Sequence, residues 1–227
     1  TRHSAIMDQH DPAKRIGLIV DEWGTWYNVE PGTNPGFLYQ QNTIRDALVA
    51  GITLHIFHRH CDRVRMANLA QLVNVLQSVI LTEEDRMLLT PTYHVFDMFK
   101  VHQDAELLET AETIEQIETE RGTIPKVSVS ASRAEGRIHV SLCNLDYEFG
   151  ATVHIELRGW KEAGLEVDAG LEVTGTTLTS GPIDGHNTFD HPDQVKPATF
   201  TSFKLDGHVL ETVLPPMSVT MLELAKK

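Results

Sequence analysis

The 227-residue sequence has little of several features that define common classes of protein. It contains no apolar run of about 18 residues, the length that a membrane-spanning helix requires. The longest apolar stretch, residues 73–81, is interrupted by Asn74, Gln77 and Ser78. Positive charge is also scarce, since 19 basic and 32 acidic residues give a net charge of −13. This charge argues against a nucleic-acid backbone or an anionic membrane as partner, whereas a neutral substrate is compatible with it.

Cysteine is scarce too, because Cys61 and Cys143 are the only two and lie far apart in the sequence. Two free thiols fit a reducing compartment better than a disulfide-stapled fold. Residues 1–15 are polar and show no signal peptide, so we expect a cytoplasmic protein. We interpret the opening on Thr1, rather than on Met, as a sign that an N-terminal portion is missing.

Motifs that bind phosphates or nucleotides are absent. There is no glycine-rich phosphate loop, no dinucleotide fingerprint and no Ser-His-Asp arrangement, and we expect no cofactor. A cluster of His55, His58, His60, Cys61 and Asp62 suggests a metal site. However, only His55 and His58 would share a helix face, and zinc sites have cleaner ligand pairs. We therefore expect no metal and interpret these residues as helix-end and barrel-packing residues.

Residues 15–22 form the stretch around which the N-terminal part is organised. Their apolar run has no alternation and predicts a strand buried on both faces. The run ends in Asp21 and Glu22, and in parallel α/β proteins this end of a strand carries the active site. The alternative is a core strand followed by a solvated acidic turn. Trp23 and Trp26 favour the active-site interpretation, because sugar-binding clefts use such aromatic side chains as stacking walls.

The next segment predicts a βα unit. From residue 37 to about residue 57 apolar side chains recur at helical spacing, with Asn42 and Asp46 on the other side of the helix. Residues 63–70 predict a second strand, and Gln71 follows that strand directly. A strand, a long helical crossover and another strand are typical of a parallel sheet.

A loop around residues 82–85 and a helix over residues 93–102 complete this first part.

Residues 104–120 then carry many acidic side chains and no basic one. After them the pattern changes to period two, at residues 127–130, 138–142 and 152–157. Short alternating strands separated by Gly, Asn and Asp turns indicate an antiparallel sandwich.

The fold class is therefore α/β followed by all-β, and we place the boundary near residue 103. Residues 1–103 form the α/β part, and residues 104–227 form the β-sandwich. Two βα units cannot close a barrel, which requires eight.

Several segments, in order along nearly the whole chain, resemble the family 51 glycoside hydrolases, the α-L-arabinofuranosidases. The first is Asp-Glu-Trp-x-x-Trp-Tyr over residues 21–27, directly after the buried strand. The others cover residues 42–48, 65–75, 90–96, 186–189 and 214–220. The resemblance implies that the chain holds the last two βα units of a (β/α)8 TIM barrel, whose first six units precede Thr1. A jelly-roll-like sandwich that also packs against the barrel would follow, with residues 186–189 as a structural signature.

The resemblance also assigns roles to individual residues. Glu22 matches the catalytic nucleophile, Trp26 matches the residue that packs against the arabinofuranose ring, and Gln71 matches the glutamine that hydrogen-bonds the sugar hydroxyls. Asp21 should point the opposite way on an extended strand, and we interpret it as structural. Without the family motif, Trp26 could be a core tryptophan and Gln71 an ordinary surface residue.

The second catalytic group is not found in this sequence. The acid/base glutamate of the family follows an asparagine, and no Asn-Glu pair occurs here. The chain alone is therefore expected to be inactive. The implied enzyme is a retaining α-L-arabinofuranosidase that hydrolyses terminal non-reducing α-L-arabinofuranosyl residues from arabinoxylan or arabinan oligosaccharides by double displacement. The family is often hexameric, so we expect a homo-oligomer.

Two alternatives stay open at this point. As an isolated polypeptide, the chain could be a non-catalytic carbohydrate-associated or structural module. It could also belong to a related barrel glycosidase that acts on another sugar, such as an endoglucanase or a xylosidase.

Overall fold

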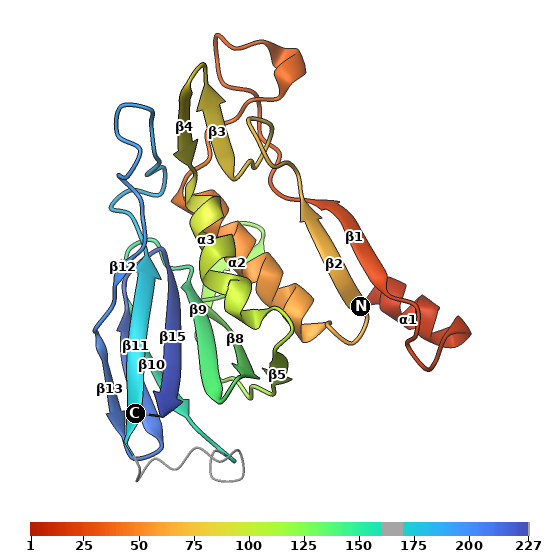
Figure 1. Cartoon of the computed structure of the whole chain (residues 1–227), viewed down its shortest axis with the longest axis vertical. Coiled ribbons are helices and arrows are strands. Elements are labelled where there is room, and N and C mark those ends of the chain that lie inside the picture. The colour runs from red at the N-terminus through yellow and green to blue at the C-terminus, as the bar shows by residue number, and fades with distance from the viewer. Residues whose placement is uncertain (160–169, 227) are drawn as a thin grey trace.

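The computed structural model describes residues 1–159 and 170–226. In the N-terminal part, β1 (Leu18–Trp23) and β2 (Val64–Leu69) form a parallel pair, and α2 (Ile44–Arg59) connects them. The other elements of this part are α1 (Arg2–His10), η1 (Pro35–Phe37), β3 (Ile80–Glu83), β4 (Arg86–Leu89), α3 (Pro91–Phe99) and η2 (Lys100–His102). Figure 1 shows α2 and α3 between the β1–β2 pair and a larger sheet.

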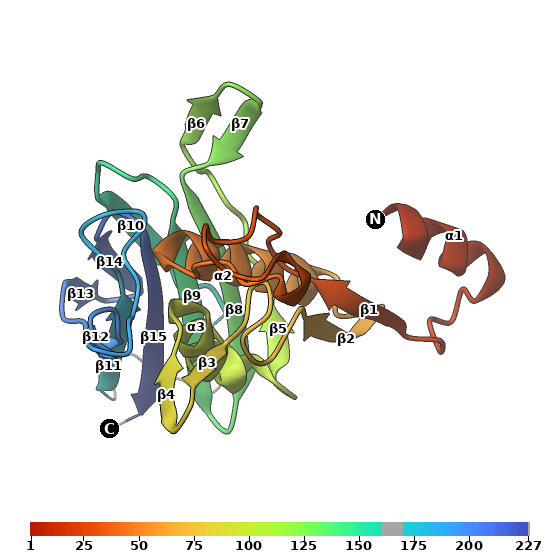
Figure 2. The same cartoon turned by 90° about the horizontal axis from the view of Figure 1, so that it is seen from above.

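Antiparallel sheets make up the C-terminal part. The six-stranded sheet has the order β12-β11-β15-β9-β8-β5, and a three-stranded sheet has the order β10-β14-β13. A hairpin of β6 and β7 projects from the body (Figure 2). The strands are β5 (Glu106–Leu108), β6 (Gln116–Thr119), β7 (Gly122–Pro125), β8 (Val127–Ala134), β9 (Arg137–Asn144), β10 (Ala151–Glu156), β11 (Leu171–Leu178), β12 (Ala198–Thr199), β13 (Phe203–Asp206), β14 (Val209–Leu214) and β15 (Ser218–Lys226). The described chain is thus mostly β-sheet with few helices.

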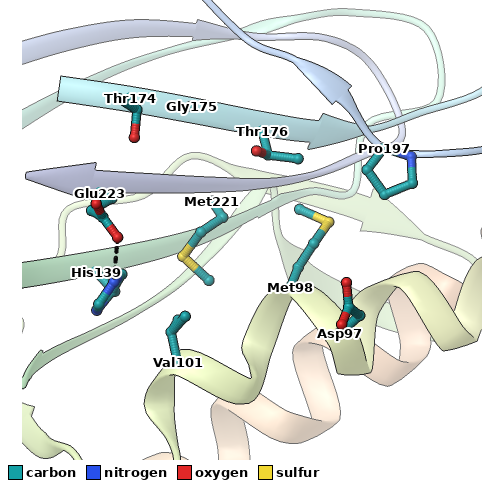
Figure 3. Close-up of a pocket in the computed structure, with 10 residues that line it drawn as sticks. All are labelled: Asp97, Met98, Val101, His139, Thr174, Gly175, Thr176, Pro197, Met221 and Glu223. Carbon is teal, nitrogen blue, oxygen red and sulfur yellow. Dashed lines mark hydrogen bonds and ion pairs between the residues drawn. The ribbon is translucent and has the colours of Figure 1, made fainter.

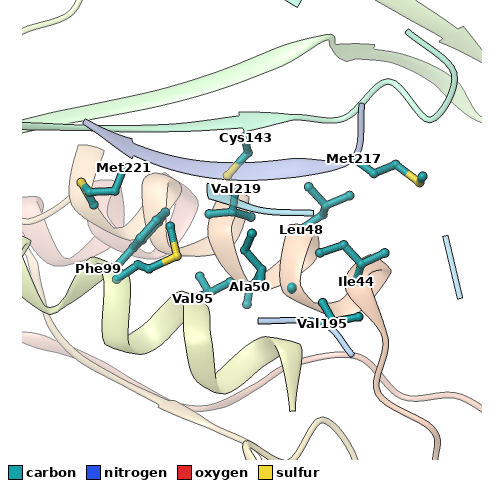
Figure 4. Close-up of a cluster of buried hydrophobic side chains, with 13 residues drawn as sticks. Ile44, Leu48, Ala50, Val95, Phe99, Cys143, Val195, Met217, Val219 and Met221 are labelled. Atoms are coloured by element: carbon teal, nitrogen blue, oxygen red, sulfur yellow. The ribbon is translucent and has the colours of Figure 1, made fainter. Parts of the chain in front are cut away.

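The six-stranded sheet is buried on both faces. Its inner face packs against the three-stranded sheet through side chains such as Val140, Leu210 and Leu222. Its outer face packs against α2 and α3, where Leu48, Val95 and Val219 belong to a second core (Figure 4). Because this second core draws side chains from both sides of residue 103, the two parts of the chain share buried apolar surface. The division into domains at residue 103 stays a prediction.

The prediction that the first strand is buried on both faces is wrong for this chain. Leu18 and Val20 are partly buried, whereas the side chains of Ile16 and Ile19 are 64% and 47% exposed. The reason is that β1 pairs with β2 alone among the described strands, in a two-stranded sheet. Met66 on β2 is exposed as well.

Two local predictions also need correction. The helix begins at Ile44 rather than near residue 37, because Thr43 and Asp46 form a capping box that fixes its start. Asn42 and Asp46, expected on the polar side, are fully buried and hydrogen-bonded. The loop expected around residues 82–85 is the tight turn of the β3–β4 hairpin.

The segment around Asn187 joins the sandwich to the helical part. The Asn187 amide donates to the carbonyl oxygens of Leu89 and Val195, and its oxygen accepts the Val195 N–H at 2.7 Å. Nearby, the carbonyl of Gly185 accepts the N–H of Ile44 at the start of α2. This stretch therefore has the structural role expected of it.

Close packing between α2 and the sheet generates a stability prediction. A Cβ atom added at Gly51 would lie 2.7 Å from Sγ of the buried Cys143. Gly51→Ala should therefore lower the free energy of unfolding by about 1–3 kcal/mol through overpacking, although alanine is the better helix former. In a Cys143→Ala background the same change should be neutral or stabilising. Urea unfolding of the four proteins tests this, and an equal cost of Gly51→Ala in both backgrounds would contradict it.

Candidate active site

An irregularity in β1 lies at the two acidic residues. Val20 pairs with Ala67 and Trp23 pairs with Leu69, so β1 advances three residues while β2 advances two. A bulge of this kind bends a strand and can redirect a side chain. Asp21 and Glu22 are both exposed in this chain. Among the described residues, neither carboxylate has a hydrogen-bond or ion-pair partner, which leaves Glu22 free to meet a ligand.

Trp23 fixes the end of this strand to the helices. Its indole ring lies edge-on to Phe57 of α2, with centroids 5.5 Å apart, and is stacked on Phe96 of α3 at 6.0 Å. Trp23, the residue directly after Glu22, is therefore held in place by aromatic packing.

Trp26 lies on the loop that follows β1, and its side chain is 67% exposed. Trp26 is therefore not part of either hydrophobic core within the described residues. The next residue, Tyr27, lies under the guanidinium of Arg45, whose Cζ atom is 4.0 Å from the ring centroid. The loop that follows the Glu22 strand thus presents exposed aromatic surface.

Gln71 lies at the same edge of the strand pair as Glu22. The N–H of Ala70 donates to the carbonyl of Trp23 at 2.8 Å, and Gln71 follows across a cis peptide bond. The side chain of Gln71 is exposed, and within the described residues its amide makes no hydrogen bond. Parallel pairing thus brings Glu22, Trp26 and Gln71 to the carboxyl ends of β1 and β2, although 49 positions separate Glu22 from Gln71 in the numbering.

Sequence reasoning missed three buried polar residues behind this edge. Gln40, Asp46 and Gln77 converge on Thr25, next to Trp26. Asp46 alone has a sequence signal, because it lies at the third position of α2, where a capping carboxylate is directed back toward the chain before the helix.

Two cavities in the described part of the chain lie away from these residues. One, of about 270 Å³, lies between α3 and the six-stranded sheet and includes Met98, His139 and Glu223 (Figure 3). The other is formed by residues 190–194. Neither of these two cavities includes Glu22, Trp26 or Gln71.

The suspected metal cluster is dispersed. Asp62 forms an ion pair with Lys14, and Cys61 is exposed and free. His55 and His58 instead face the sandwich, where they meet Ser128 and Ser130 of β8 at 2.9 and 3.1 Å. Within residues 1–159 and 170–226, no three His, Cys, Asp or Glu side chains lie close enough to hold a metal ion. His55 and His58 are therefore packing residues, but the prediction that they pack within a barrel is wrong, because their partners lie in the sandwich.

The histidines and serines form a connected polar layer. Ser141 Oγ donates to the carbonyl of Ser130 at 3.2 Å and lies 2.9 Å from Nε2 of both His55 and His102. A hydroxyl has one hydrogen, so both Nε2 atoms must donate to it. The two Nδ1 atoms then accept from Ser128 and Ser132, at 2.9 and 2.7 Å. This pattern satisfies both imidazoles in the neutral state.

The fold of this chain is shared with solved structures of glycoside hydrolases. The chain superimposes on the crystal structure of the GH51 arabinofuranosidase from Xanthomonas axonopodis pv. citri with a TM-score of 0.91 and 46% identity, covering 98% of this chain and 44% of that one. It also matches the thermostable GH51 α-L-arabinofuranosidase from Thermotoga petrophila RKU-1, with a TM-score of 0.77 and 25% identity over 96% of this chain and 45% of that one. The fold is thus that of the C-terminal region of glycoside hydrolases of family GH51.

The family model for the α-L-arabinofuranosidase C-terminal domain matches residues 21–218. The intracellular exo-α-L-arabinofuranosidase of Bacteroides ovatus is 45% identical over 225 residues, which is 98% of this chain and 42% of that protein. The chain belongs to the α-L-arabinofuranosidase family. It spans less than half of the length of the relatives named here. In the described residues, no helix combines the length and apolar character needed to cross a bilayer.

The polar layer predicts how stability depends on pH. Burial, with Arg59 nearby, lowers the pKa of His58 to about 4, and burial with His58 nearby lowers that of His102 to about 3. In the unfolded chain both should titrate near ~6.5, so the unfolded state binds more protons below that pH. Stability should therefore fall as the pH drops from about 6.5 toward 4, by up to ~1.4 kcal/mol per pH unit for each histidine.

Urea unfolding of the wild type and of a His58→Gln/His102→Gln variant at pH 7 and pH 5 measures this effect. The variant, which has no titrating group at either position, should lose less stability between the two pH values. Equal losses would contradict the prediction.

Proposed function

We propose that this chain is the C-terminal part of a retaining exo-acting α-L-arabinofuranosidase. In this proposal β1, α2 and β2 belong to the last two units of a (β/α)8 barrel, and the sheets that follow form a jelly-roll-like domain. The observation that carries the proposal is an exposed carboxylate, Glu22, at the carboxyl end of a parallel strand, with the exposed Trp26 on the loop that follows. The exposed apolar side chains of Ile19 and Met66 on the strand pair, and of Ile16 just before it, are suited to contact with further barrel units.

The chemistry follows from what each side chain offers. A retaining glycosidase uses two carboxyl groups about 5–5.5 Å apart, one as nucleophile and one as acid and base. Glu22 would attack the anomeric carbon of arabinofuranose while the acid protonates the leaving oxygen, and water would then hydrolyse the glycosyl ester on Glu22. The acid/base glutamate would come from the part of the enzyme that precedes this sequence.

Two other residues would bind the sugar. The indole face of Trp26 would pack against the furanose ring, which presents C–H groups to it. The amide of Gln71 can both donate to and accept from hydroxyl groups, which suits a neutral polyol. A terminal arabinofuranosyl group of an arabinoxylan or arabinan oligosaccharide is the proposed substrate.

The setting of the enzyme is part of the proposal. The Bacteroides ovatus relative is named as intracellular, which supports a cytoplasmic location. The family resemblance supports a homo-oligomer, such as a hexamer, for the complete enzyme.

The role of Glu22 is tested in the complete protein. Glu22→Gln should lower kcat by a factor of at least about 10⁴, because it removes the nucleophile, while sugar binding stays largely intact. Asp21→Asn is the matched control, since this neighbouring carboxylate is also exposed, and it should keep turnover. Hydrolysis of an aryl α-L-arabinofuranoside gives the rates. Normal turnover by Glu22→Gln, or loss of turnover in Asp21→Asn alone, would reject Glu22 as the nucleophile.

The need for a second carboxyl group is tested by comparing two proteins. The 227-residue chain alone should not hydrolyse the aryl arabinofuranoside, whereas the protein extended at its N-terminus should do so readily. Circular dichroism of the short chain confirms that it is folded. Turnover by the short chain at the rate of the longer one would show that the acid/base group lies within these residues.

A further inference from the structure

The loop after Glu22 is held through almost every polar group of one residue, Thr25. Its N–H donates to Gln77 Oε1 at 2.8 Å, and its hydroxyl donates to Asp46 Oδ1 at 2.7 Å. The amide of Gln40 donates to the carbonyl oxygen and to the hydroxyl of Thr25, at 3.3 and 3.2 Å. The backbone of Thr25 therefore has little freedom to move.

The three residues that hold Thr25 are themselves fixed. Gln40, Asp46 and Gln77 are 2%, 0% and 0% exposed, and they come from three separate segments of the chain. The Gln77 amide also donates to the carbonyl oxygen of Asp46 at 2.7 Å. Burying polar side chains is costly unless they are hydrogen-bonded, so this network is stable in one arrangement.

The network holds the residues on both sides of Trp26. Gln40 Oε1 accepts the N–H of Tyr27 at 2.9 Å, and Arg45 covers the Tyr27 ring. Gly24, which precedes Thr25, has φ +144°, a conformation that favours glycine. The main chain is thus fixed before and after Trp26, whereas the indole itself is largely exposed.

A stacking surface binds best when it is in place before the ligand arrives, because no free energy is then spent on ordering it. We propose that Gln40, Asp46 and Gln77 are positioning residues that hold the main chain around Trp26, so that its indole face is fixed beside Glu22 for the sugar. The inference rests on the proposed function for its substrate, but the immobility of Trp26 can be measured without any turnover.

The first test measures the order of Trp26 in the chain itself. Labelling with 5-fluorotryptophan gives ¹⁹F resonances, and Trp26→Phe identifies that of residue 26. In Thr25→Val, which lacks the hydroxyl, this resonance should narrow and move toward its position in the urea-unfolded chain. Thr25→Ser keeps the hydroxyl and should retain the wild-type signal.

A second pair of variants tests the network independently, in case Thr25→Val does not fold. Gln40→Met should also narrow the Trp26 resonance and move it toward its position in the unfolded chain. Gln41→Met, at the neighbouring position outside the network, should leave the resonance unchanged. Urea unfolding confirms that each variant is folded. An unchanged Trp26 resonance in both folded Thr25→Val and Gln40→Met would overturn the proposal.

The second test is kinetic and uses the complete enzyme. Thr25→Val should lower kcat/KM for an aryl arabinofuranoside by about 10- to 100-fold, as expected when a binding group is misplaced by about 1 Å. Thr25→Ser and Gln41→Met should retain the wild-type value. If Thr25 acts through Trp26, then Thr25→Val should cause no further loss in a Trp26→Ala background.

Each outcome separates the two proposals. If Thr25→Val lowers kcat/KM by the same factor in the wild-type and the Trp26→Ala backgrounds, the positioning role is overturned. The proposed arabinofuranosidase activity is not affected by that result. A wild-type enzyme that does not cleave arabinofuranosides would overturn the proposed function, and the ¹⁹F signals would still decide whether the network immobilises Trp26.

Discussion

One buried carboxylate, that of Asp46, links the fold to the candidate site. Its Oδ2 atom accepts the N–H of Thr43 and so caps α2, the helix against which both parts of the chain pack. Its Oδ1 atom accepts the hydroxyl of Thr25 on the loop that carries Trp26. The start of the central helix and the position of the loop are therefore set by the same group, and a change in one must affect the other.

The sequence pattern predicted the helices and strands better than it predicted which of their side chains are buried. The strand, helix and strand over residues 15–70 are present, and the period-two segments correspond to β8, β9 and β10, although the last segment extends one residue beyond β10. Exposure was harder to predict, because hydrophobic periodicity assumes that polar side chains face water. Asp46 and Asn42 are buried since hydrogen-bond partners await them in other segments, and those partners cannot be seen from local spacing.

The candidate site shows the same limit. Glu22, Trp26 and Gln71 were assigned from a family motif, and parallel pairing brings them to one edge of the strand pair. The bulge at Asp21 and Glu22 has no recognisable sequence signal, because it depends on the register with β2. Gln40 and Gln77 look like surface glutamines until the structure shows where their amides lie, and no spacing rule connects them to Thr25.

The interface between helices and sheet combines two kinds of contact. Apolar side chains such as Leu48 and Val219 supply the non-directional part. The layer of histidines and serines adds hydrogen bonds that form in one alignment of α2 on β8 and β9 only. Apolar contact alone would tolerate some sliding of the helix, whereas the polar layer determines its register on the sheet.

The projecting hairpin has a practical consequence for work on this protein. Residues 116–125 pair with one another and contribute no side chain to either hydrophobic core. Surface turns of this kind tolerate added residues, since no buried contact has to be rebuilt. The tip between Thr119 and Gly122 is accordingly the natural point at which to attach an affinity tag or a fluorophore, far along the chain from the loop that bears Trp26 (Figure 2).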